Sequence, residues 1–268
     1  MSTDVTTTTR RETCAIAVMA KASEPGRTKT RLTPPLTSAE AAALNTAFLR
    51  DVTAKLMRVG DETPIAPYVA FGPPRSEPFF RAILAEGPEL IEVWRPNFGE
   101  CLWLATTSML EAGHTAACVL NSDSPTLPTA YLVEAAQWLA RPGDRAVLGP
   151  STDGGYYILG LKQAHRRMFA DIDWSTERVA EQTRVRAREI GLEVHELPLW
   201  YDVDDADSLR TVVADLRLGV APADANPAAS RADATAELLR RLDRENGLFR
   251  RLEIDAAVSS AGLQGALI

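Results

Sequence analysis

The sequence predicts one three-layer α/β domain built on a mixed, mostly parallel sheet. Three observations favour this fold. Apolar runs of about five to eight residues alternate with amphipathic stretches, which is typical of parallel strands joined by helices. The chain has 268 residues, of which 46% are hydrophobic and 24% are charged, so it is long enough to bury a sizeable core. Late in the chain, Gly154 and Gly155 precede an apolar run, which indicates a hairpin or edge strand that interrupts the alternation.

Short apolar runs mark the predicted strands, and apolar residues at helical spacing mark the predicted helices. A capping box, Thr37-Ser-Ala-Glu40, predicts the start of the first helix, which then continues with a regular apolar face. We expect strands at residues 14–20, 67–71, 90–94, 115–120, 145–149, 156–161 and 192–197. We expect further helices at residues 99–112, 129–139, 176–190, 205–216 and 234–249.

Composition shifts along the chain predict its organisation. Residues 1–12 are polar and low in complexity, so we expect a disordered tail before a main domain at residues 13–219. Residues 220–233 are rich in alanine and proline and are typical of a linker. Residues 234–268 then form a helical extension, which could dock on the domain or pair with a second copy in a homodimer.

Charge and cysteine usage exclude several classes of protein. The formal net charge of -7 argues against a protein that binds nucleic acid through bulk positive charge. The three cysteines form no CxxC pair, which argues against a zinc knuckle or a disulfide framework. No apolar run has the length of a membrane span or of a signal-peptide core, so a cytoplasmic location is expected.

A basic loop follows the first predicted strand. It contains Lys21, Arg27, Lys29 and Arg31, although the whole chain is acidic. A loop at the carboxyl end of the first strand of an α/β sheet is the usual place for a bound phosphate, and Gly26 would let the backbone approach it. The alternative is a solvated run of charges.

Carboxylates follow two other predicted elements. Asp123, next to Ser122, ends the most convincing buried strand, and Asp202 and Asp204 form a second acidic group about eighty residues later. Carboxylate oxygens are ligands for Mg²⁺ or Mn²⁺, and two separated carboxylates on one metal suit transfer of a phosphate-bearing group. We expect Asp123 with either Asp202 or Asp204 as metal ligands. The alternative for Asp123 is a structural role in an Asx turn or a helix cap. The adjacent Asp205 is expected to cap the helix that follows.

Two further motifs could contact substrate. Gly154 and Gly155 would let a nucleotide sugar or an acceptor lie against the backbone, although a hairpin turn explains them equally well. A second motif precedes a predicted helix, whose start could hold an anion, unless a hydroxyl there is only the N-cap. The candidate substrate contacts are Gly154, Gly155, Tyr156, Trp174, Ser175 and Thr176.

Together these motifs resemble the bacterial transferases of the nucleotide-diphospho-sugar (glycosyltransferase A) superfamily, in the group labelled arsenosugar-biosynthesis-type glycosyltransferases or a domain of unknown function. The chain is more distantly similar to guanylyltransferases of cofactor synthesis. The resemblance implies a Rossmann-like GT-A domain whose basic loop holds the diphosphate and whose Asp123 holds the metal. It rests on the segments Ala20 to Leu32, Asn121 to Pro128, Asp153 to Tyr157, Asp171 to Thr176 and Asp202 to Leu209.

The expected function is metal-dependent transfer of a sugar from a nucleotide to a small acceptor. In this reading Lys21, Arg27, Lys29 and Arg31 neutralise the diphosphate. Glu100 and Asp153 are the candidates for activating the acceptor, so the expected catalytic residues are Asp123, Lys29, Glu100 and Asp153. The alternatives are a nucleotidyltransferase that couples an NTP to a phosphorylated small molecule with release of pyrophosphate, and a nucleotide-binding protein without catalysis. The segment 96–101 departs from the family pattern and motivates this last alternative.

Overall fold

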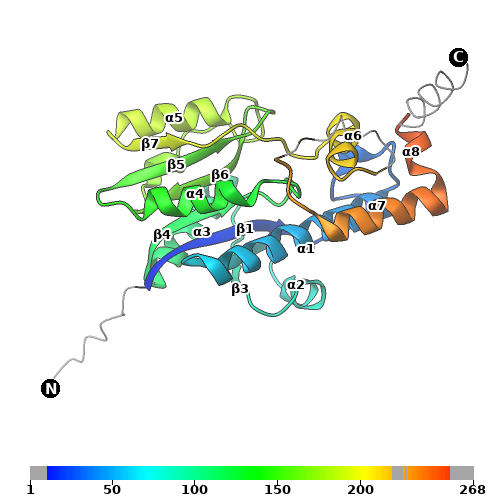
Figure 1. Cartoon of the computed structure of the whole chain (residues 1–268). Helices are drawn as coiled ribbons and strands as arrows, with labels where there is room; N and C mark the ends of the chain where they lie inside the picture. Colours follow the sequence, from blue (N-terminus) through cyan, green and yellow to red (C-terminus); the bar gives the residue numbers. More distant parts are fainter. Residues whose placement is uncertain (1–10, 219–225, 227, 254–268) are drawn as a thin grey trace, which may run out of the picture.

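The fold is a seven-stranded mixed sheet with helices on both sides, and this confirms the predicted class. The computed structural model of the chain describes residues 11–218, 226 and 228–253. The strands lie in the order β3-β2-β1-β4-β6-β5-β7, and β6 alone runs antiparallel to its neighbours (Figure 1). The strands are β1 (Arg11–Lys21), β2 (Ile65–Gly72), β3 (Glu89–Glu92), β4 (His114–Leu120), β5 (Arg145–Pro150), β6 (Tyr156–Leu161) and β7 (Glu193–Glu196).

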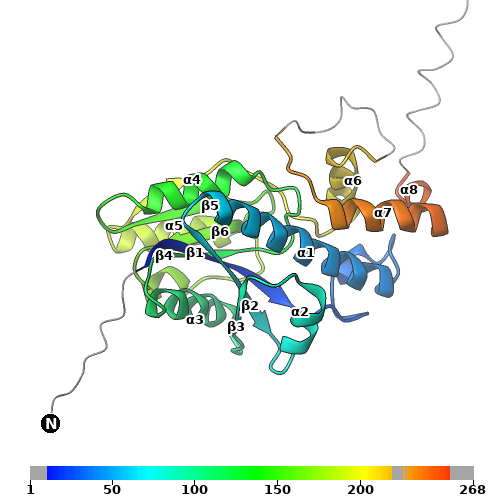
Figure 2. The same cartoon turned by 60° about the horizontal axis from the view of Figure 1, so that its bottom comes forward.

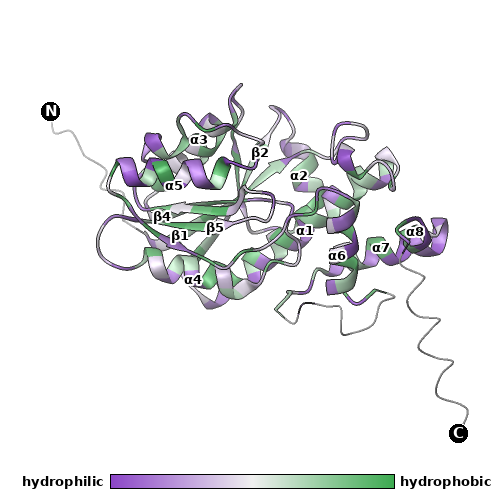
Figure 3. Ribbon diagram, turned by 90° about the horizontal axis from the view of Figure 1, so that it is seen from above, coloured by the Kyte–Doolittle hydropathy of each residue, from purple (hydrophilic) through white to green (hydrophobic). Residues whose placement is uncertain are grey.

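Helices connect the strands and cover the two faces of the sheet. They are α1 (Ser38–Glu62), α2 (Glu77–Ile83), α3 (Phe98–Glu111), α4 (Thr129–Leu139), α5 (Val179–Glu189), α6 (Ala206–Asp215), α7 (Asp233–Asn246) and α8 (Leu248–Arg251), with two short 3₁₀ helices, η1 (Thr30–Leu32) and η2 (Arg166–Phe169). Figure 3 shows hydrophobic residues gathered along the strands, whereas the helices carry both hydrophobic and hydrophilic residues. This distribution follows from strands that are buried on both faces and helices that are buried on one.

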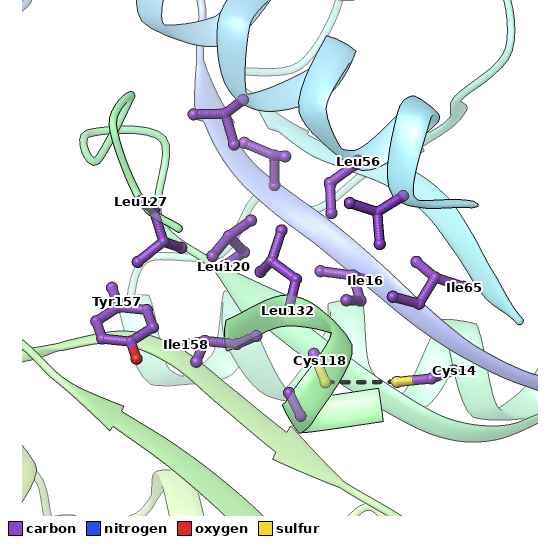
Figure 4. Close-up of a cluster of buried hydrophobic side chains, with 14 of the residues drawn as sticks. Cys14, Ile16, Leu56, Ile65, Cys118, Leu120, Leu127, Leu132, Tyr157 and Ile158 are labelled. Atoms are coloured by element: carbon purple, nitrogen blue, oxygen red, sulfur yellow. Dashed lines mark hydrogen bonds between the residues drawn. The ribbon is translucent and has the colours of Figure 1, made fainter. Parts of the chain in front are cut away.

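Two cores lie on opposite faces of the sheet. On one face, α1, α2 and α4 pack against side chains of β1, β2, β4 and β6. This core includes Ile16 of β1, Leu56 of α1 and Leu132 of α4 (Figure 4). On the other face, α3, α5 and η2 pack against the alternate side chains of the same strands. The thiols of Cys14 and Cys118 meet in the first core at 3.6 Å and are both free.

A third core joins the helical extension to the domain. The amino-terminal half of α1 packs with η1, α6, α7 and α8, and α1 and α7 lie side by side in both views (Figures 1 and 2). Arg251 of α8 pairs with Glu40 of α1 at 3.0 and 3.1 Å. Although burial alone would raise the pKa of Glu40, hydrogen bonds from Arg251, Thr37 and Asn246 lower it to about 2. The described part of the extension, up to residue 253, therefore docks on its own chain, and residues 254–268 lie outside the described part.

A carboxylate of the domain also caps the extension. The N-cap position of α7, Ala232, has no side-chain acceptor. Asp51 of α1 accepts instead from the backbone N–H groups of Ala234 and Thr235, at 2.9 and 2.8 Å, and from the Thr235 hydroxyl at 2.6 Å. These bonds satisfy donors that every helix start leaves open.

Some element boundaries differ from those predicted. The strand β1 begins at Arg11, inside the segment expected to be a tail, and the linker residues 220–225 and 227 lie outside the described part of the chain. The expectation that Ser175 or Thr176 caps a helix is wrong, because α5 begins only at Val179. Ser175 has a φ of +65°, in the left-handed region, so a right-handed helix cannot run through it. The short helix α2 was not predicted.

Among the described residues, no helix is both long enough and apolar enough to cross a membrane.

Candidate functional site

A cavity of about 490 Å³ opens where the strands β1, β2, β3 and β4 end. Because β1 lies between β2 and β4, the chain leaves β1 toward one side of the sheet and later returns on the other. Open α/β sheets bind ligands in the crevice at such a switch point. The residues that line the cavity include Lys21, Arg27, Lys29, Arg31, Ser122, Asp123 and Asp204. The fold thus brings the basic loop and two of the three expected metal ligands to one place.

The basic loop is held in shape by its own polar groups. Thr28 accepts a hydrogen bond from the backbone N–H of Glu24 at 2.9 Å, and Asn45 of α1 donates to Ser23 at 2.9 Å. Gly26 has a φ of +78°, which glycine adopts without strain, and it lies in the turn rather than in the lining of the cavity. The side chains of Arg27 and Arg31 are 72% and 74% exposed, so both are available to a ligand.

Lys29 differs from these arginines because its ammonium is buried. Its Nζ donates to Asp204 Oδ1 at 2.7 Å and to the carbonyl of Val203 at 2.8 Å, and it lies 2.9 Å from Asp123 Oδ2. Its side chain is 6% exposed. Burial alone would lower the pKa of Lys29, but the two carboxylates outweigh burial and raise it. A charged ammonium therefore joins two carboxylates that come from distant parts of the sequence.

Hydrogen bonds tie together the two loops that carry these carboxylates. The backbone N–H of Val203 donates to the carbonyl of Asp123 at 2.9 Å, and the Ser124 hydroxyl donates to the carbonyl of Tyr201 at 2.8 Å. Ser122 donates to Asp123 Oδ1 at 3.0 Å. Hydrogen bonds to the backbone of both loops thus fix the relative position of Asp123 and Asp204.

Asp202 does not line the cavity and is not among the oxygens that contact Lys29. Its Oδ1 accepts from the Ser151 hydroxyl at 2.9 Å. Burial, with the nearby charges of Asp153, Asp204 and Asp123, raises the pKa of Asp202 to about 6. Four carboxylates therefore gather here, but no three His, Cys, Asp or Glu side chains form a ready metal cage among the described residues.

A second buried lysine lies behind the Asp123 loop. Lys55 of α1 is 1% exposed, and its Nζ donates to the carbonyls of Pro125 and Leu127 at 2.9 and 2.5 Å. Burial lowers the pKa of Lys55 to about 7, although the charge of Asp51 opposes this shift. Lys55 was not predicted from the sequence, because a lysine beside the apolar face of a helix normally extends to solvent.

Most of the remaining predicted site residues do not line the cavity. Glu100 lies outside the cavity lining and 3.6 Å from Arg166, and Asp153 accepts from the backbone N–H of Gly155. Gly154 is explained by packing, since a Cβ there would lie 2.0 Å from the Glu177 carbonyl oxygen.

The aromatic residues of this predicted set lie closer. Tyr156 lines the cavity, and Trp174 contacts both Tyr156 and the lining residue Phe98 edge to face. The hydroxyl of Thr176 donates instead to the carbonyl of Asp173 at 2.7 Å, and neither Ser175 nor Thr176 belongs to the lining.

One side of the cavity is apolar, and its residues were not predicted from the sequence. Trp94, in the loop after β3, and Phe98, at the start of α3, line the cavity and are exposed. Asn121 lines it too, and its buried Oδ1 accepts no hydrogen bond from the described residues. The available signal was the aromatic residue Trp94 at the carboxyl end of a predicted strand, where α/β sheets bind ligands.

Comparison with known proteins agrees with this fold. The family model described as "Uncharacterized protein conserved in bacteria (DUF2064)" matches residues 54–176. A crystal structure described as a "putative nucleotide-diphospho-sugar transferase" from Desulfovibrio desulfuricans G20 is 26% identical, with a TM-score of 0.73 over 89% of this chain and 97% of that one. No protein of curated function matches the sequence. The predicted resemblance is thereby confirmed, and the enzyme class to which it points is a transferase.

A more distant structure shares the fold. The CMP:2-keto-3-deoxy-manno-octonic acid synthetase complexed with CTP is 13% identical, with a TM-score of 0.51 over 78% of this chain and all of that one. At this identity the likeness concerns the fold alone.

Proposed function

We propose that this protein is a nucleotide-dependent transferase that binds a nucleoside diphospho-sugar in the cavity and moves the sugar to a small acceptor. The observation that carries the proposal is the convergence of four basic side chains and two aspartates on one cavity at the switch point of the sheet. The similarity to a nucleotide-diphospho-sugar transferase over most of both chains supports the same class.

Basic and apolar residues of the cavity would contact different parts of the ligand. Arg27, Arg31 and Lys21 neutralise the diphosphate, since guanidinium groups match phosphate oxygens and remain accessible here. Trp94 and Phe98 offer an apolar wall to the uncharged parts of the ligand.

A divalent cation would fit between Asp123 and Asp204 once the Lys29 ammonium has left this position. The fit is indicated by the buried ammonium of Lys29, a positive charge that both carboxylates already hold at 2.9 and 2.7 Å. Mg²⁺ or Mn²⁺ would take two protein ligands here and complete its shell with phosphate oxygens and water. When bound, such an ion stabilises negative charge on the leaving nucleotide. Asp202 is the less suitable ligand of the pair, because its carboxylate binds Ser151.

Ligand binding tests the proposal without an acceptor. The thermal midpoint of the purified protein is measured with nucleoside diphospho-sugars and with NTPs, each with and without Mn²⁺ or Mg²⁺, because a ligand of the native state raises the midpoint by mass action. A metal-dependent rise with one diphospho-sugar, followed by sugar transfer to small acceptors, is the expected result. A rise confined to one NTP, with release of pyrophosphate, would replace glycosyl transfer by nucleotidyl transfer. Binding without turnover of any donor would indicate a protein that has lost catalysis.

A further inference from the structure

The bonding of Lys29 conflicts with a role as a free phosphate ligand. An ammonium has three protons, and the three oxygens around Nζ, on Asp204, Asp123 and Val203, take all of them. A phosphate can therefore reach this ammonium only by replacing one of these oxygens. Arg27 and Arg31 of the same loop are, by contrast, mostly exposed, and Arg31 Nη1 lies 3.8 Å from the other carboxylate oxygen of Asp204.

The ammonium also lies where the proposed metal would lie. A divalent ion bound to Asp123 and Asp204 needs carboxylate oxygens at about 2.0 to 2.6 Å. Those two oxygens now approach Lys29 Nζ at 2.9 and 2.7 Å. If both cations contacted the same two carboxylate oxygens, their positive charges would lie close together and repel one another strongly. The ammonium and a divalent cation therefore cannot occupy this position at the same time.

We propose that Lys29 is an internal cation that keeps the metal site closed in the free protein and opens it when the phosphates of the nucleotide arrive. This inference rests on the proposed function and adds an order of events to it. Metal alone must drive a buried ammonium away from three acceptors and leave its charge unpaired, which is costly. Phosphate oxygens provide new acceptors, so the metal and the nucleotide each strengthen the binding of the other.

The backbone at Lys29 is suited to such a release. Lys29 has φ and ψ of 53° and 42°, in the left-handed region, which is uncommon for a residue with a Cβ. It stands at the N-cap of η1 without any side-chain capping bond. The contacts with Asp123, Asp204 and Val203 therefore help to hold a conformation that the local chain does not favour.

Manganese binding without nucleotide tests the inference. Free Mn²⁺ is measured by electron paramagnetic resonance during titration of the wild type and of Lys29→Met, with Lys29→Gln as a second variant that keeps a donor toward the carboxylates. We expect both variants to bind one Mn²⁺ at least tenfold more tightly than the wild type. The added substitution Asp123→Asn should remove this gain, and Lys162→Met, outside the cavity, should behave as the wild type. Equal affinity in the wild type and the folded Lys29 variants would overturn the inference.

A second measurement uses only the wild type. Mn²⁺ and inorganic pyrophosphate are added separately and together, and thermal midpoints are compared. The inference expects the joint rise to exceed the sum of the two separate rises, and an additive result would contradict it. Tight Mn²⁺ binding by Lys29→Met needs no nucleotide, so it can be observed even if the proposed function fails. Conversely, if the wild type binds nucleotide but the Lys29 variants bind Mn²⁺ no more tightly than the wild type, only the role of Lys29 is removed.

Discussion

Two buried lysines, Lys29 and Lys55, show how different surroundings give the same side chain different roles. Lys29 lies between the carboxylates of Asp123 and Asp204, and its pKa is raised. Lys55 donates to two backbone carbonyls, and its pKa falls to about 7. Carboxylates balance a full charge, whereas carbonyl dipoles satisfy hydrogen bonds without balancing it. We infer that the first environment is built to hold exchangeable cations and the second to fix a loop.

The largest difference between the two regions should appear in turnover. In Asp123→Asn the side chain keeps its size but loses the charge that faces the proposed cation, so kcat should fall on the order of 10³-fold, equivalent to about 4 kcal/mol. Steady-state kinetics with the donor found by thermal shift measure this effect. Unfolding in urea should change little, because Asp204 still pairs with Lys29. Full activity of Asp123→Asn would remove this carboxylate from the mechanism.

The next largest effect is a loss of folding stability when Lys55 is replaced. In Lys55→Met the carbonyls of Pro125 and Leu127 lose their donor, so the variant should be about 2 kcal/mol less stable at pH 9, measured by urea unfolding.

The same comparison has a defined pH dependence. Between pH 7 and 10.5 the unfolded wild type carries a proton on Lys55 that the folded protein releases, so its free energy of unfolding rises with pH. The gap between wild type and variant should therefore widen from pH 7 to pH 9, by up to about 1.4 kcal/mol per pH unit. A gap that is constant with pH would show that Lys55 stays charged when buried.

The smallest predicted effect is the loss of stability when Asp51, the charged neighbour of Lys55, is replaced. Asp51→Asn removes a carboxylate that caps α7 and favours the charged form of Lys55, and it should destabilise the protein by about 1 kcal/mol. The thermal midpoint measures this loss, and Asp61→Asn, on the exposed side of the same helix, is the matched control. A variant as stable as this control would mean that water caps α7 equally well.

Much of the fold and part of the site could be predicted from the sequence. Apolar runs and their spacing located the strands, and chain order then placed the basic loop and Asp123 at the same edge of the sheet. The contacts of Lys29 could not be predicted, because Asp204 lies 175 positions away and only the folded backbone brings it close. Lys55 was missed for a related reason, since the carbonyls that bind it belong to a loop 70 and 72 positions away.

The third core has a consequence for the growing chain on the ribosome. Asp51 on α1 and Ala234 on α7, which meet there, lie 183 positions apart. At about 5 to 20 residues per second, roughly 10 to 40 s pass between their syntheses. During that interval the apolar side chains of α1 that α7 later covers, such as Leu44 and Phe48, lack this partner. The α1 face that α7 covers in the folded protein is thus without this cover for much of translation.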